Sequence, residues 1–338
     1  MQEYRDSLSL YENRLQSESI SVISIPSELG SDARGLAATP QHLLDHGLEG
    51  RLASLGLEAS RVSIACPEPQ GIILQSRVKN LDEVVGVSEA SCRAVQDAVS
   101  RGQFALTLGG DHSIALGTIS GAALAHESLG IIWVDAHPDA NTEETTLSGN
   151  IHGMPMAALM GFGNSQLIQI GSTKRKIDPN HVLYVGLKDL DQAEIDFVRR
   201  EKIEAVTMHD IAAHALQPVF AAIDALRGKV EKIWVSMDID SIDEHYSPGV
   251  AMNSQGGLTR REVLAIANYI GKTVTLAGMD LVEMVPEKDQ DGATTKLVFE
   301  LISNFLGCSD GSYAEYMGKY EQAGNMDKIL IPSARMRA

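Results

Sequence analysis

Short apolar, β-branched runs that alternate with helical patterns constrain the fold of this chain most strongly. Such runs predict strands, and the segments between them have the periodicity of helices. We expect strands at residues 19–25, 61–66, 104–108, 130–134, 182–186, 205–208, 232–237 and 273–281. We expect helices at 81–101, 114–126, 154–160, 192–202, 211–226, 259–269 and 294–305. Strand followed by helix, repeated, predicts an α/β fold with a parallel sheet covered on both faces.

The organisation along the chain indicates one large domain. The chain has 338 residues, of which 44% are hydrophobic, so it can bury a large core. No linker-like segment divides it, and we expect a single domain over residues 1–338. Residues 309–338 form a weakly patterned tail that either lacks fixed structure or reaches a neighbouring subunit.

Charge and cysteine content limit the partners and the compartment. The formal net charge is −17, which argues against nucleic-acid binding and is compatible with a cationic substrate. The three cysteines, Cys66, Cys92 and Cys308, match no disulfide or metal framework, so we expect a reducing cytoplasm. Residues 1–16 lack the apolar core of a signal peptide, and no apolar run is long enough for a membrane span.

Three clusters of carboxylates and histidines follow expected strands. They are Gly109-Gly110-Asp111-His112-Ser113, Asp135-Ala136-His137-Pro138-Asp139 and Ser236-Met237-Asp238-Ile239-Asp240. Residues two apart in an extended segment point the same way, so Asp135 shares a side with His137, and Asp238 shares one with Asp240. Because ligands bind at the carboxyl ends of parallel strands, we expect the three clusters to converge.

Four carboxylates cannot gather without compensating charge, because like charges at close range oppose ionisation. Two divalent cations would balance the four negative charges. Oxygen-rich ligation with some imidazole suits Mn²⁺ better than zinc or copper. Two such ions can lower the pKa of a shared water molecule and provide a hydroxide nucleophile.

Taken together, the three clusters resemble the signature of the ureohydrolase (arginase/agmatinase) superfamily, and the resemblance runs from near Ile25 to Glu283. It implies a three-layer α/β/α sandwich with a central parallel sheet, assembled as a homotrimer or homohexamer and holding two Mn²⁺ per chain. It also implies a set of metal ligands: His112 and Asp139 at one ion, His137 and Asp240 at the other, and Asp135 and Asp238 between them.

Within the superfamily, two stretches are most similar to arginases, which hydrolyse L-arginine to urea and L-ornithine through a metal-bridging hydroxide. In residues 139–153, the likeness assigns the substrate α-carboxylate to Asn141 and Ser148, with Thr146 acting through water. It makes His152 the residue that shuttles protons, and Asp139 the residue that orients the hydroxide. The remaining assignments are the α-amino group to Asp191 and Glu194, and the guanidinium to Glu283.

Two departures from the arginase pattern leave other functions open. Met252 stands where arginases usually have a threonine, and Met284-Val285-Pro286 replaces the usual Val-Asn-Pro. The alternative substrates are agmatine, guanidinobutyrate, formiminoglutamate or a modified arginine. An alternative of another class is a catalytically silent metal-binding protein. Asp191 and Glu194 also have a purely structural interpretation, as a helix N-cap and a first-turn acid.

Overall fold

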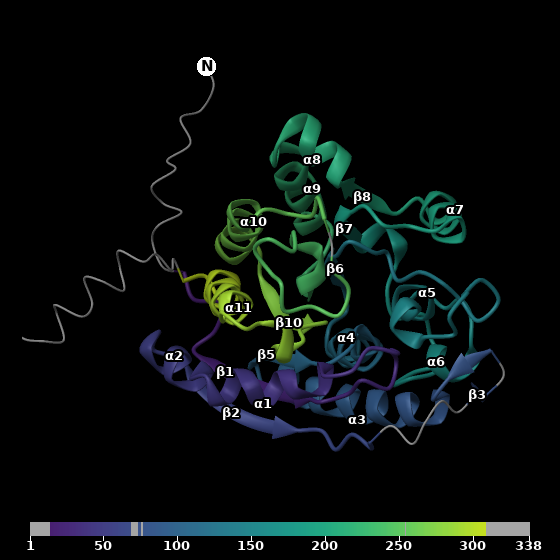
Figure 1. The fold of residues 1–338 in the computed structure, drawn as a ribbon, viewed down its shortest axis with the longest axis horizontal. Coiled ribbons are helices and arrows are strands. Elements are labelled where there is room, and N and C mark those ends of the chain that lie inside the picture. The colour runs from purple at the N-terminus through teal and green to yellow at the C-terminus, as the bar shows by residue number, and fades with distance from the viewer. Residues whose placement is uncertain (1–13, 69–73, 76, 254, 309–338) are drawn as a thin grey trace, which may run out of the picture.

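A central sheet of eight parallel strands organises the molecule (Figure 1). The computed structural model describes residues 14–68, 74–75, 77–253 and 255–308, so the predicted tail at 309–338 lies outside the described residues. The strand order is β2-β1-β5-β10-β9-β6-β7-β8. The strands are β1 (Ser19–Ile25), β2 (Glu58–Ser63), β5 (Phe104–Gly109), β6 (Leu129–Val134), β7 (Val182–Leu187), β8 (Glu204–Thr207), β9 (Lys232–Asp238) and β10 (Leu276–Val282). The predicted parallel sheet is confirmed.

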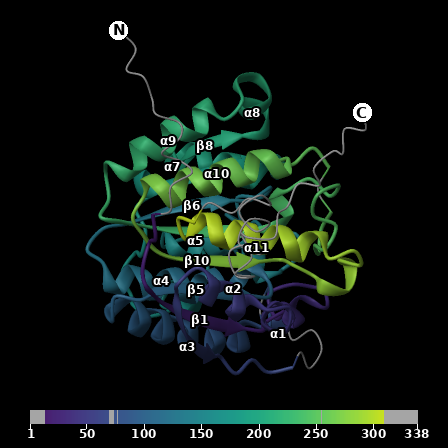
Figure 2. The same ribbon diagram turned by 90° about the vertical axis from the view of Figure 1, so that its left-hand side faces the viewer.

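Helices cover both faces of this sheet. One face carries α1 (Thr39–Asp45), α2 (Leu48–Ser54), α8 (Met208–His214), α9 (Gln217–Arg227), α10 (Arg260–Thr273) and α11 (Ala293–Phe305). Figure 2 looks onto this face, with α10 and α11 lying over the strands. The other face carries α3 (Leu81–Ser100), α4 (Ala115–Ala125), α5 (Pro155–Leu159), α6 (Ser165–Ile168) and α7 (Gln192–Glu201). The three-layer α/β/α sandwich is therefore present.

Alternation along the strands divides the apolar side chains between two cores. In β9, Ile233, Val235 and Met237 pack with the helices of the first face, whereas Trp234 packs with those of the second. Both sets are fully buried. A strand that is apolar on both sides can only lie between two layers, which is why the central strands have continuous apolar runs.

The structure differs from the sequence expectation at a few elements. The helix expected at 211–226 is two helices, since Ala215 adopts a φ of 53° and Pro218 is the second residue of α9. Proline has no N–H to continue a helix and clashes with the preceding turn. The strand expected at 61–66 begins at Glu58 instead; it is a mostly exposed edge strand without an apolar pattern. Three short helices, α1, α2 and α6, were not expected.

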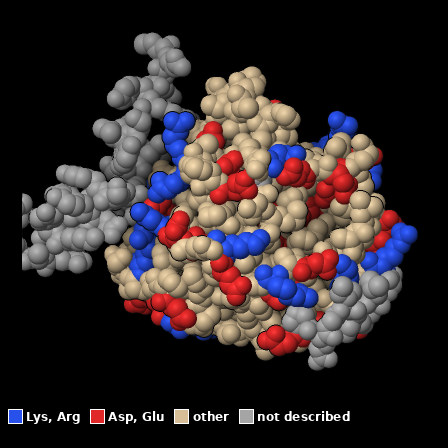
Figure 3. Space-filling view, in the orientation of Figure 1, with Lys and Arg blue, Asp and Glu red and all other residues tan. Residues whose placement is uncertain are grey.

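A second, two-stranded antiparallel sheet is separate from the main sheet. It pairs β3 (Leu74–Gln75) with β4 (Val78–Lys79) just before α3. No helix among the described residues has the length and apolar character needed to cross a bilayer. On the face seen in Figure 3, acidic and basic side chains are interspersed, so the net negative charge is not gathered into one patch there.

Candidate metal centre

The carboxyl ends of four adjacent strands bring the predicted ligands together. In the sheet, β5, β10, β9 and β6 are neighbours, and one polar cluster or acid follows each of them. His112 follows β5, Glu283 follows β10, Asp238 ends β9 and Asp135 follows β6. All four side chains are at most 4% exposed. Parallel pairing therefore produces the convergence expected from the sequence.

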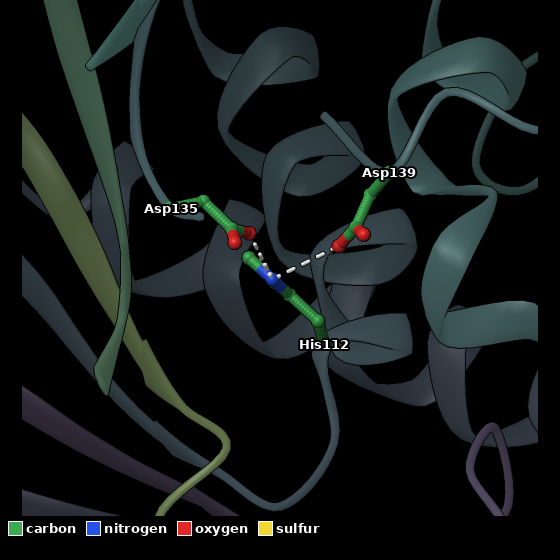
Figure 4. A group of neighbouring side chains, drawn as sticks. All are labelled: His112, Asp135 and Asp139. Atoms are coloured by element: carbon green, nitrogen blue, oxygen red, sulfur yellow. Dashed lines mark ion pairs between the residues drawn. The ribbon is translucent and has the colours of Figure 1, made fainter. Parts of the chain in front are cut away.

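Three carboxylates surround one nitrogen of His112. Its Nδ1 lies 3.1 Å from Oδ2 of Asp135, of Asp139 and of Asp238. Figure 4 shows Asp135 and Asp139, both in the segment after β6, pointing toward this nitrogen of His112, which follows β5. Nδ1 is buried and has no hydrogen-bond partner in the described part of the chain. A buried imidazole nitrogen facing three carboxylate oxygens is an arrangement suited to a cation.

The other nitrogen of His112 fixes the tautomer. Nε2 lies 2.9 Å from Ser236 Oγ, and Ser236 Oγ lies 3.3 Å from Asp280 Oδ2. The serine hydroxyl donates to the carboxylate, so its oxygen accepts the Nε2–H of His112. The lone pair of Nδ1 is then left free to bind a metal, as in many metal sites with a hydrogen-bonded histidine.

Asp135 also contributes to a second group. Its Oδ1 lies 3.4 Å from His137 Nδ1, and Asp240 Oδ2 lies 3.4 Å from the same nitrogen. The other oxygen of Asp240 is buried without a partner among the described residues. Two candidate cation sites therefore share Asp135: one has His112 and Asp139, and the other has His137 and Asp240.

Backbone hydrogen bonds orient these carboxylates. Asp135 Oδ1 accepts from the His137 N–H at 2.7 Å, and Asp238 Oδ1 accepts from the Asp240 N–H at 2.8 Å. Each bond is a local turn in which the side chain bonds the backbone two residues on. It leaves the second carboxylate oxygen directed at His112, which explains why an acid stands two residues before each following ligand.

Burial and mutual repulsion act on the acids of this cluster. Burial, with the charges of Asp240 and Asp135, raises the pKa of Asp238 well above its usual range. The same effects from burial and Asp135 raise the pKa of Asp240 to about 6. Burial would also raise the pKa of Asp135, but the imidazole rings of His112 and His137 close to its carboxylate hold that pKa below its usual range. Cations would remove this repulsion, so the donor set fits a metal centre.

His152 and Glu283 form a pair beside the metal-ligand cluster. His152 Nδ1 lies 3.0 Å from Glu283 Oε1, which also accepts the His112 N–H at 2.8 Å. Burial alone would lower the pKa of His152, but the bond to Glu283 outweighs it and raises that pKa to about 9. Glu283 and Asp139 have positive φ values of 63° and 47°. Left-handed backbone at two non-glycine residues is strain concentrated at this site.

A pocket of about 320 Å³ opens onto this cluster, a volume suited to a small molecule. Gly153, Asp189 and Met252 line it, together with residues predicted to bind metal, to bind substrate or to act in catalysis. These predicted residues are His137, Asp139, Asn141, Ser148, His152, Asp191, Glu194, Asp238, Asp240 and Glu283. Thr146 is not in this lining; its hydroxyl accepts the Gly149 N–H at 3.0 Å.

Asp191 and Glu194 have structural contacts as well as a place in the lining. They form a reciprocal capping box at the start of α7. Asp191 Oδ2 also accepts from Asn141 Nδ2 at 2.8 Å, which links two of the predicted substrate residues. Burial and the charge of Asp139 raise the pKa of Glu194 to about 7. The structural interpretation of these acids and their place in the pocket are therefore compatible.

Sequence reasoning missed the residues behind the ligands. Trp133 and Trp234 were given no role in the site. Trp133 stacks on His112 with ring centres 4.0 Å apart, and its Nε1 donates to Asp135 Oδ2 at 2.9 Å. Trp234 donates to Asp280 at 2.9 Å, and Asp280 was given no role at all. Only the three-dimensional arrangement shows these contacts; tryptophan two residues before an aspartate was the sole hint.

Comparison with known families places the chain. A family model described as "Arginase family" matches residues 18–308. This chain belongs to the arginase family. It is 37% identical to the arginase of Bacillus caldovelox over 292 residues, covering 85% of this chain and 98% of that protein. A 35% identical relative is the arginase of Brevibacillus brevis, with 86% of this chain and 98% of that protein covered.

Solved arginase structures agree with this membership. The native structure of the B. caldovelox arginase superposes with a TM-score of 0.83, covering 86% of this chain and 99% of that one. An Entamoeba histolytica arginase crystallised with L-ornithine is 30% identical with a TM-score of 0.80, covering 87% and 100%. As an arginase-family member, the chain is a hydrolase. Enzymes of this family depend on metal ions, and the two Asp/His groups are the candidate ligands here.

Proposed function

We propose that this enzyme hydrolyses the guanidinium group of L-arginine to urea and L-ornithine with two Mn²⁺ bound per chain. One observation carries the proposal: the two Asp/His groups that share Asp135 meet a pocket also lined by the residues assigned to an α-amino acid. The arginase-named relatives at 35–37% identity support the same substrate.

In this proposal the six ligands divide between the two ions. His112 and Asp139 would hold one ion, His137 and Asp240 the other, and Asp135 and Asp238 would bridge. The donors are carboxylate oxygens and imidazole nitrogens, which suit Mn²⁺. When bound, such ions lower the pKa of a coordinated water molecule and make it nucleophilic near neutral pH.

The chain's own residues then position the substrate and move protons. Glu283 pairs with the guanidinium, since its carboxylate is buried at the cluster and a charge-assisted hydrogen bond is strong there. Asp139 accepts a hydrogen bond from the attacking water and orients it. His152, held protonated by Glu283, gives a proton to the departing amino group. Its ring is about a quarter exposed, so it can exchange protons with solvent.

The far end of the pocket would recognise the amino-acid part of the substrate. Asn141 and Ser148 would donate to the α-carboxylate, with Thr146 acting through water. Asp191 and Glu194 would accept from the α-ammonium group. These assignments favour arginine over agmatine, which has no carboxylate.

Met252 favours one alternative. It is 54% exposed and lines the pocket, so an apolar, flexible side chain faces the substrate space. A guanidino or formimino compound other than arginine would suit such a wall. A metal-binding protein without turnover is the alternative of another class.

A product-release assay separates these functions. The purified protein loaded with Mn²⁺ is given L-arginine, agmatine, guanidinobutyrate or formiminoglutamate. We expect the highest kcat/KM for L-arginine, with urea and ornithine released in equal amounts. Preference for another compound would replace arginine as the substrate, and no turnover of any of them would favour the silent binding protein.

The proposal also includes the assembly and the compartment. We propose a homotrimer or homohexamer, which light scattering on the purified protein would test. A cytoplasmic location is supported by Cys66, Cys92 and Cys308, which are all free thiols in the structure.

A further inference from the structure

Lys79, in β4, forms hydrogen bonds both with the loop that carries Ser148 and with the segment that carries Asp32. Lys79 Nζ donates to Asp32 Oδ1 and Oδ2 at 2.9 and 2.7 Å, and to Asn150 Oδ1 at 2.9 Å. Asn150 Nδ2 also donates to Asp32 Oδ2 at 3.3 Å. An ammonium group has three donors, and all three meet oxygens here. Asp32 comes from the segment after β1, Lys79 from β4, and Asn150 from the loop of residues 141–150.

The backbone of the same loop lies against β4. The Lys79 N–H donates to the Gly149 carbonyl at 2.9 Å. Gly149 has a φ of 76°, and a Cβ added there would lie 2.6 Å from the Arg77 carbonyl oxygen. Only glycine combines that φ with so close an approach. The close contact between β4 and the loop therefore requires glycine at position 149.

These contacts lie directly beside residues of the pocket. The Asn150 N–H donates to Ser148 Oγ at 3.2 Å, and the His152 N–H donates to the Gly30 carbonyl at 3.1 Å. At the other end of the loop, Asn141 is held by Asp191. The loop is thus fixed at both ends, by Asp191 at one and by Lys79 at the other.

We propose that Lys79, with Asp32 and Asn150, is a positioning residue for substrate recognition, holding the loop so that Ser148 meets the carboxylate of the substrate. This inference rests on the proposed function. Lys79 touches none of the reacting groups in the structure, and it acts through Asn150 and Gly149. Asp32 is about half exposed, so the ion pair contributes little to global stability and its main effect is local.

The charge of Lys79 is removed in the variant Lys79→Met, which keeps an unbranched side chain only one atom shorter. Its matched control is Lys229→Met, since Lys229 donates to the Asn180 carbonyl before β7, at the amino end of the strands. Kinetics of the Mn²⁺-loaded enzyme are measured with L-arginine. Agmatine, as substrate or competitive inhibitor, reports on a ligand with the guanidinium and no carboxylate. Asp32→Asn, at an exposed position, tests the same ion pair if Lys79→Met does not fold.

We expect KM for L-arginine to rise about 5- to 20-fold with kcat changed less than about 2-fold. The KM or inhibition constant for agmatine and the manganese content should stay as in wild type. All values of the Lys229→Met control should stay as in wild type too. An unchanged KM for L-arginine in both Lys79→Met and Asp32→Asn would overturn the inference. An equal loss of affinity for arginine and agmatine would also overturn it, because that result indicates general disruption of the site. A wild-type enzyme without arginine turnover would instead overturn the proposed function, and this inference with it.

Discussion

His152 Nδ1 lies 3.0 Å from Glu283 Oε1, and the same oxygen accepts the backbone N–H of His112. One carboxylate oxygen therefore links His152, the proposed proton carrier, to the backbone of His112, a candidate metal ligand. Glu283 reaches this place because it follows β10, next to β5 and β9 in the sheet. Replacing Glu283 should therefore remove a hydrogen-bond partner from both His152 and the His112 backbone.

The histidine of this pair should contribute pH-dependent stability. Its pKa is raised from the ordinary 6.5 to about 9, so the contribution is complete below pH 6.5 and is lost as the pH rises through about 9. The size of the shift sets an upper bound of roughly 3 kcal/mol. Urea unfolding of the metal-free wild type and of His152→Asn, followed from pH 6 to 10, should show the wild-type advantage shrinking with pH. The exposed His245→Asn is the control, and an advantage that grows with pH would contradict the pairing.

Ser236 should contribute to metal affinity and little to the free energy of unfolding. Replacing it by alanine removes the acceptor of His112 Nε2–H, and loss of such a partner weakens metal binding by about 10- to 100-fold. Titration of the metal-free protein with Mn²⁺ measures this. Ser91→Ala, which removes a buried serine in α3, should leave the affinity unchanged. Equal affinities of the two variants would remove Ser236 from the account.

Gly110 should not accept a side chain. A Cβ there would lie 1.8 Å from the Ser27 carbonyl oxygen, and that carbonyl accepts the Asp111 N–H. We expect Gly110→Ala to lower the free energy of unfolding by about 1–3 kcal/mol and to displace Asp111. Gly50→Ala has open space in α2 and should be neutral or stabilising. Urea denaturation compares the two, and similar stabilities would mean that the close approach at Gly110 relaxes freely.

The convergence of the candidate metal ligands could be predicted because each of them comes at or just after the end of an apolar strand. Asp135, His137, Asp238 and Asp240 follow apolar strands, and parallel pairing brings such ends together. Trp133 and Asp280 escaped prediction, because their roles depend on contacts across strands. The ladder from Asp280 through Ser236 to His112 joins three separate segments of the chain.

A few secondary-structure boundaries and contacts were also missed from the sequence. In the helix expected at 211–226, Pro218 was a local signal that was overlooked, since it is the second residue of α9 and a new helix begins there. The edge strand β2 is largely exposed, so it has no apolar pattern to mark its start. Lys79 likewise carries no motif, and its contact with Asn150 spans 71 positions.

The most direct test of the two-metal account is an Mn²⁺ titration of metal-free protein with L-arginine hydrolysis followed at each step. We predict that urea release saturates at two ions bound per chain, and that Asp238→Ala shows neither full binding nor turnover. A fully metallated and active Asp238→Ala enzyme, or wild-type activity that saturates at one ion per chain, would contradict it.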